Sequence, residues 1–80
     1  MTIYEYYVVY PDGDRQEIPG PLEFDALVDL NGRPLPLPLP TAKMIAYRVV
    51  KIRRSEERGE AVSLHYVELV PAAELLRYTR

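Results

Sequence analysis

Residues 22–40 have the sequence LEFDALVDLNGRPLPLPLP, in which two segments of different character meet at Asn31-Gly32. The even positions from 22 to 30 are all apolar, and three of the four odd positions between them are acidic. A period of two is typical of a half-buried strand. Asn-Gly is favoured in a two-residue turn between antiparallel strands. The pattern therefore predicts a hairpin between residues 22–30 and residues 33–40.

The alternating prolines constrain the register of this hairpin. Leu30 and Arg33 flank the turn and should form a hydrogen-bonded pair, which places Leu35 opposite Val28. Pro34 and the prolines after it then fall where an N–H would face away from the partner strand, so the ladder loses no donor. We expect the alternate leucines to stack on one face, with Leu37 opposite Ala26 and Leu39 opposite Phe24.

Two other interpretations of this stretch exist. Residues 21–31 would form a short helix if Pro21 took the first helical position and Gly32 followed the last turn. Residues 34–40 would bind a partner domain if they adopted a polyproline helix. Three residues make one turn of that helix, however, so leucines at every second position would not share a face. Only the hairpin explains both the alternating pattern of residues 22–30 and the spacing of the prolines in residues 34–40, and it is the interpretation we adopt.

The rest of the chain predicts two more hairpins and a helix. Residues 2–10 are rich in β-branched and aromatic residues, and a Pro-Asp-Gly turn leads into a shorter strand over residues 15–18. Residues 43–53 and 61–70 form the third pair, joined by a charged, exposed loop over residues 54–60. One register sets Tyr47 opposite Tyr66 and Val49 opposite Leu64. A helix over residues 71–78 must dock on the sheet, because two turns are unstable alone.

Size and composition limit the architecture to one domain. The chain has 80 residues, no cysteine, an apolar fraction of 48% and a mean hydropathy of −0.20. It is therefore expected to fold without disulfide bonds. We predict a single small all-β domain over residues 1–80. Five or six antiparallel strands would form an open barrel or roll, SH3-like or related, with a short C-terminal helix.

No motif in the sequence points to catalysis. His65 is the sole histidine, and Ser63 lies on the same predicted strand face without an orienting acid. The isolated glycines form no phosphate-binding loop. We therefore expect no enzyme activity, no cofactor and no metal ion. Residues 1–10 lack the features of a signal peptide, and no apolar run is long enough to span a membrane. The sequence thus predicts a cytoplasmic protein without a membrane partner.

The aromatic composition favours an interaction surface. The chain has seven tyrosines, one phenylalanine and no tryptophan. Tyrosine suits shallow cores and interfaces because its hydroxyl needs water or a partner. A domain of this size also has a small core. We expect a non-catalytic protein-interaction or structural/regulatory module that binds an unknown protein partner or itself, as a homodimer.

A basic cluster supplies the alternative function. Small barrels bind single-stranded nucleic acid by stacking bases on aromatic rings beside a positive groove. Glutamates in the same loop and a net charge of −2 weigh against this alternative. Under either hypothesis the candidate surface consists of the same seven residues: Tyr47, Arg48, Lys51, Arg53, Arg54, Arg58 and Tyr66.

Overall fold

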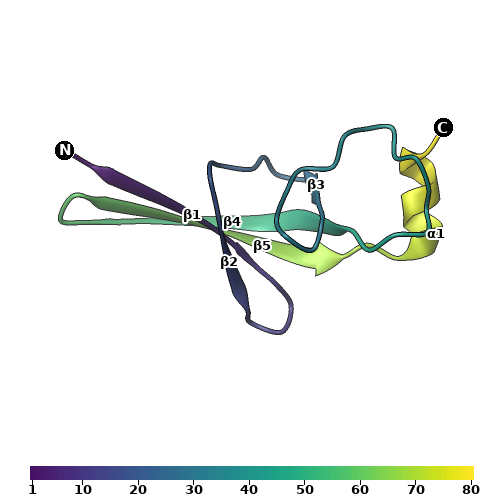
Figure 1. Ribbon diagram of the computed structural model, residues 1–80. Helices are drawn as coiled ribbons and strands as arrows, with labels where there is room; N and C mark the ends of the chain where they lie inside the picture. Colours follow the sequence, from purple (N-terminus) through teal and green to yellow (C-terminus); the bar gives the residue numbers. More distant parts are fainter.

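The computed structural model describes residues 1–80, and its main element is a five-stranded mixed sheet that forms a half-barrel (Figure 1). The strand order is β2-β1-β5-β4-β3. A short C-terminal helix, α1, continues into one 3₁₀ turn. This architecture confirms the predicted small β fold with a C-terminal helix. The bounds are β1 Ile3–Val9, β2 Arg15–Ile18, β3 Leu27–Val28, β4 Tyr47–Glu57, β5 Glu60–Leu69, α1 Ala72–Leu75 and the 3₁₀ turn Leu76–Tyr78.

The hairpin of β1 and β2 forms as its turn residues predict. The two strands are antiparallel, with Tyr6 opposite Ile18 and Val9 opposite Arg15. Gly13 takes a φ of +92°, which a glycine adopts without strain. The Tyr10 amide closes the turn by donating to the Asp14 carbonyl.

The pairing of β1 with β5 is parallel, so the expectation of an entirely antiparallel sheet is wrong at this position. Tyr7 lies beside Leu64, and Val8 lies beside His65. Antiparallel neighbours are often joined by short turns, which leave a signal in the sequence. A parallel pair needs a long crossover, and here most of the chain lies between the two strands.

The hairpin of β4 and β5 has a tighter turn than predicted, and β4 begins at Tyr47 instead of at residue 43. Arg58 and Gly59 have φ values of +42° and +84°, as in a two-residue turn, so the predicted loop over residues 54–60 is mostly strand. This turn sets Glu57 opposite Glu60, and an irregularity between Val49 and Lys51 shifts the register beyond it. The expected register is therefore wrong: Tyr47 lies opposite Leu69, and Val49 lies opposite Val67.

Residues 22–30 form neither the predicted strand nor the alternative helix. Only Leu27 and Val28 are in a strand, and they pair with the start of β4. A turn precedes them, in which the Ala26 amide donates to the Glu23 carbonyl and Asp25 takes a φ of +69°. The turn reverses the chain before it reaches β4, so Phe24 stays exposed instead of joining the apolar face.

The predicted proline hairpin is reduced to a short contact whose register is shifted by one residue. The Asp29 amide donates to the Arg33 carbonyl across a three-residue loop, so Val28 faces Pro34 rather than Leu35. The Leu35 amide donates to Leu27, which leaves Pro34 at a position without a ladder hydrogen bond, as expected. Beyond Leu35 the leucines separate: Leu37 is exposed, whereas Leu39 is buried and lies beside Thr79.

Two apolar clusters hold one end of the sheet together. Leu27 and Val28 are adjacent in β3 but belong to different clusters. The first cluster joins β1, β2, β3, β4 and β5, and the second lies under the proline segment and α1. Their buried members are Val8, Ile18, Val28, Val49 and Val67 in the first, and Leu27, Leu39, Ala46, Val70 and Leu75 in the second.

The C-terminal helix is attached at several points. Leu75 is fully buried in the second cluster, and the Leu39 amide donates to the Tyr78 carbonyl. Arg48 on β4 reaches both Glu68 on β5 and Glu74 on α1, at 2.6 and 2.7 Å. These contacts order a helix that is too short to be stable alone. Neither α1 nor the turn that follows it has the length and apolar character of a membrane-crossing helix.

Candidate interaction surface

One end of the sheet projects from the packed body as an arm, defined here as residues 3–5 of β1, 50–57 of β4 and 60–64 of β5. The molecule measures 45 × 23 × 17 Å, and Figure 1 shows these three strands extending to the left, with no helix or other strand over them. Every residue from 50 to 60 is exposed. Within the arm only Ala61 and Ser63, small residues on the central strand, are buried.

The outer edge of β4 is unpaired along the arm. β3 pairs only with Tyr47 and Arg48, and the loop before it reaches one residue further: the Asp25 amide donates to the Val49 carbonyl, and the Val49 amide donates to Ala26. No other segment forms a backbone hydrogen bond with this edge beyond Val49. The arm therefore presents a row of free N–H and C=O groups.

The tight turn determines which groups point outward. Glu57 and Glu60 flank a two-residue turn and exchange hydrogen bonds with each other in such a hairpin. Residues along an antiparallel strand alternate between facing the partner and facing away from it. The N–H and C=O groups of Ile52, Arg54 and Glu56 therefore face the free edge.

Charged side chains on this edge have no partner in the chain. Arg48 forms the ion pairs of the molecule, and Arg53, Arg54, Glu56 and Glu57 form none. None of their cross-strand neighbours on β5 carries an opposite charge. Arg53 faces Leu64, Arg54 faces Ser63, and Glu56 faces Ala61, while Glu57 faces the like charge of Glu60.

The outer face of the sheet brings together three of the predicted surface residues. Lys51 lies opposite Tyr66, and its Nζ is 5.6 Å from the centre of the tyrosine ring, within the range of a cation–π contact. Arg53 follows on the same face, beside the half-buried Leu64. Arg53, Leu64 and Tyr66 line a shallow hollow together with Arg54 and Ser55.

The other predicted residues lie elsewhere, so the expected single cluster is divided. Tyr47 is on the opposite face from Tyr66, because its partner Leu69 shares the face of the buried Val67. Arg48 is held by Glu68 and Glu74, and hydrogen bonds to these two carboxylates raise the pKa of its guanidinium. Arg54 points to the inner face, and Arg58 is in the turn.

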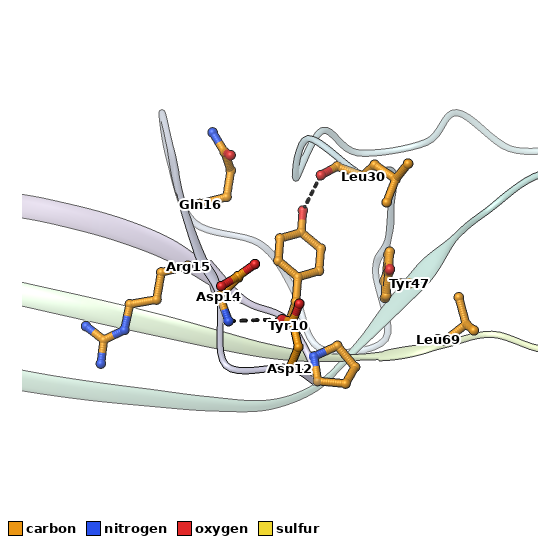
Figure 2. A pocket seen from close by; sticks show the side chains of 9 residues that line it. Tyr10, Asp12, Asp14, Arg15, Gln16, Leu30, Tyr47 and Leu69 are labelled. Carbon is orange, nitrogen blue, oxygen red and sulfur yellow. Dashed lines mark hydrogen bonds between the residues drawn. The ribbon is translucent and has the colours of Figure 1, made fainter.

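A second hollow, of about 590 Å³, lies where the first turn meets the start of β4 (Figure 2). Tyr10 stands at its centre and packs edge-on against Tyr47, with ring centres 5.0 Å apart. Figure 2 shows the Tyr10 hydroxyl directed at the Leu30 carbonyl, to which it donates at 2.8 Å, while Arg15 points away. The carboxylate of Asp12 accepts the Asp14 amide and is used in the turn. The Tyr10 hydroxyl thus connects the first turn to the loop after β3, whereas Asp12 stabilises its own turn.

Burial raises the pKa of Tyr10, and the nearby charge of Asp29 raises it further. The pKa of Tyr7 is also raised, chiefly by the charge of Glu5. Both hydroxyls therefore stay protonated at neutral pH and act as hydrogen-bond donors. Tyr10 uses its proton to fix the turn at residues 29–33.

His65 has a structural position beneath the loop that follows β2. It is buried, its Nε2 accepts the Leu22 amide at 3.1 Å, and its Nδ1 lies 3.0 Å from the Tyr7 carbonyl. Since the Leu22 amide can only donate, the ring proton resides on Nδ1 and is donated to Tyr7. Ser63 shares the buried face, as predicted, and both ring nitrogens of His65 are used to connect β5 with its neighbours.

Sequence reasoning missed the free edge because it placed residues 54–60 in a loop. The signal was present in the Arg58-Gly59 pair, which suits a two-residue turn, and in the sign change along Arg53-Arg54-Ser55-Glu56-Glu57. An all-polar strand has no apolar period, so hydrophobic patterning could not detect it.

The fold and its arm define a class of small β module with a packed body and a projecting, unpaired strand edge. The chain belongs to a protein family described as "Uncharacterised Treponema protein", whose model matches residues 2–78. No curated protein and no solved structure matches the chain.

Proposed function

We propose that the protein is a non-catalytic interaction module, acting in the cytoplasm, that binds another protein chain by extending its sheet at the arm. The observation that carries this proposal is the unpaired edge of β4 from residue 50 to residue 57. An extended segment can add to such an edge through main-chain hydrogen bonds, while side chains on alternate positions give specificity.

The lack of burial along the arm supports this function. A small sheet needs an apolar face packed on a core to be stable in water, and the arm contributes nothing to either apolar cluster. The apolar side chain of Ile52, which lies between two charged residues of β4, is 43% exposed because no other segment covers it. A partner strand would cover the free edge and part of these side chains, and would so add burial that the single chain does not provide.

The proposed function is tested with Arg54→Pro, because proline lacks the N–H that faces the free edge and is tolerated on an edge strand. Self-association is measured by sedimentation at rising concentration. Capture of a protein from an extract of the source cells is measured with the immobilised chain. We expect the wild-type chain to bind in at least one assay and Arg54→Pro to lose that binding while keeping the circular dichroism spectrum. Binding in neither assay, or binding unaffected by Arg54→Pro, would contradict the proposal.

Nucleic-acid binding remains a second candidate, and the arrangement of Lys51, Arg53 and Tyr66 on one face favours it. A half-buried ring beside two cations resembles the stacking platforms that hold single strands. A labelled single strand of mixed sequence, titrated at two salt concentrations, tests it. Salt-sensitive binding that Arg53→Glu weakens more than Arg77→Glu, a matched charge change on the C-terminal 3₁₀ turn, would support it. Absence of binding at low salt would exclude it.

A further inference from the structure

The free edge of β4 carries a charge pattern that is antisymmetric about Ser55. Arg53 and Arg54 precede this residue, and Glu56 and Glu57 follow it. If a second copy of β4 runs antiparallel with its Ser55 opposite this Ser55, Arg54 faces Glu56 of that copy and Arg53 faces Glu57. Each cation then meets a carboxylate, and the same contacts recur in the reverse direction.

The backbone of the edge fits this pairing. A symmetric antiparallel pair is related by a two-fold axis perpendicular to the sheet, so facing residues must lie on the same face. Arg54 and Glu56 both lie on the inner face and both direct their N–H and C=O groups outward, which allows them to exchange two hydrogen bonds across the axis. Arg53 and Glu57 both lie on the outer face. The pairing therefore places complementary charges on both faces of the joined sheet.

Neighbouring registers lack this match. Centring the pair on Arg54 sets Arg54 against itself and leaves Arg53 facing serine. Centring it on Glu56 sets Glu56 against itself and leaves Glu57 facing serine. Like charges directly opposite each other in a sheet are destabilising, whereas opposite charges stabilise by about 0.2–1 kcal/mol for each pair. The charges thus specify one register out of those that the backbone allows.

The pattern differs from the usual protection of an exposed edge. Edge strands that avoid association carry charges, lysine especially, that repel a second copy or disfavour its approach. Here the charges on one copy attract those on the other. Glu57 and Glu60 face each other on the outer face of the single chain. In the pair, Arg53 of the second copy comes beside Glu57 and offsets this repulsion.

We propose that the partner of the arm is a second copy of this chain, and that the two copies pair antiparallel through β4, centred on Ser55, to join their sheets. This inference rests on the proposed function and names its partner. Along the arm, the order β1-β5-β4 of one copy then continues into β4-β5-β1 of the other.

The test uses charge reversal in two complementary variants. The acidic variant combines Arg53→Glu with Arg54→Glu, and the basic variant combines Glu56→Arg with Glu57→Arg. All four side chains are exposed and unpaired in the single chain, so both variants should fold. A third variant carries all four substitutions, which restores the antisymmetric pattern in reversed order. Arg77→Glu with Arg80→Glu is the control for a change of net charge, because it lies at the C-terminus, away from the arm.

Sedimentation measures the dimer dissociation constant of each protein. We expect the acidic and basic variants to dimerise at least about tenfold more weakly than the wild type, a change of about 1.4 kcal/mol. An equimolar mixture of the two should form a heterodimer, and the fourfold variant and the C-terminal control should dimerise like the wild type. The wild-type dimer should also weaken as salt is raised from about 0.05 to about 0.5 M.

Hydrogen exchange locates the interface. In the dimer the amides of Arg54 and Glu56 should exchange more slowly than in the acidic variant, and the amides of β1 residues 3–5, at the opposite edge of the arm, should be unchanged. Dimerisation that survives both charge reversals, or that leaves these amides unprotected, would overturn the inference while leaving the interaction function standing. A wild-type chain that stays monomeric at about millimolar concentration would also overturn it, and capture sensitive to Arg54→Pro would then decide the proposed function separately.

Discussion

At the scale of single residues, Gly32 is a turn residue that packs directly against the apolar core. It takes a φ of +74° in the loop after β3, and a Cβ built on it would lie 2.8 Å from a methyl group of Ile18 and 3.3 Å from one of Val8. Both neighbours belong to the first apolar cluster and cannot move away freely. Gly32 therefore lets the loop close over the core.

The substitution Gly32→Ala should destabilise the protein by about 3 kcal/mol, because the strain of a positive φ adds to overpacking of the core. Gly13→Ala is the matched control. Gly13 has a φ of +92° but no atom within 4 Å of the added Cβ, so only backbone strain of about 1–2 kcal/mol is expected. Urea unfolding of both variants measures the difference. Equal losses of stability in the two variants would show that contact of the added methyl group with Ile18 and Val8 has no energetic cost.

The raised pKa of Tyr10 predicts a dependence of stability on alkaline pH. The folded state favours the protonated hydroxyl, so this contribution is complete below the unfolded tyrosine pKa of about 10 and is lost as pH rises through the folded value. Tyr10→Phe should lower stability at neutral pH by about 1 kcal/mol, since the hydrogen bond to Leu30 is lost. It should also make the decline above pH 10 shallower. Denaturant titrations at several pH values test both expectations, and an unchanged decline would contradict them.

At the scale of elements, the C-terminal helix depends on one buried side chain. Leu75 and Leu76 are neighbours of identical chemistry, but Leu75 is 0% exposed and Leu76 is 64% exposed. The helix itself is too short to persist without the contacts of Leu75, Tyr78 and Arg48. The helix therefore forms only because it docks on the body of the protein.

Leu75→Ala should cost about 2–5 kcal/mol, because it removes apolar burial and leaves a cavity in the second cluster. Leu76→Ala should cost less than about 0.5 kcal/mol, as expected for a surface position. Thermal unfolding followed by circular dichroism compares the two. A large loss of stability for Leu76→Ala would mean that the Leu76 side chain, exposed in the single chain, is covered by another chain in solution.

Element boundaries also show where the sequence was informative. Strand β2 was predicted with its exact residues, and β1, β5 and the helix were predicted to within one or two residues, because turns, prolines and β-branched residues act locally. The pairing of residues 22–40 was wrong, since a period of two does not distinguish a strand from a chain that bends around β4 at Asp25. The charged half of β4 was missed because nothing buries it.

At the scale of the whole molecule, stability is concentrated at one end. Both apolar clusters lie in the body, whereas the only buried residues of the arm are Ala61 and Ser63. Local opening costs less free energy where few apolar side chains are buried. The two ends of the same strands should therefore open independently.

Hydrogen exchange of the acidic variant, which is monomeric under our proposal, should reveal this gradient. Peptides covering residues 53–64 should exchange faster than those covering residues 47–49 and 66–69. The reason is that Val49 and Val67 are packed in the first cluster, while the arm has no cluster of its own. Uniform protection along β4 and β5 would contradict the division into body and arm.

The sequence by itself determined the local structure: the turn at Gly13, the strands beside it, the helix after Pro71, and the charges available on the arm. The tertiary structure decided the parallel pairing of β1 with β5, the register of β4, the separation of the leucines after Leu35, and the division of the predicted surface into two faces. The physical reason is the separation along the chain over which each kind of interaction acts. Turn and propensity preferences act between neighbours in the chain, whereas strand partners and free edges follow from how distant segments share a small apolar core.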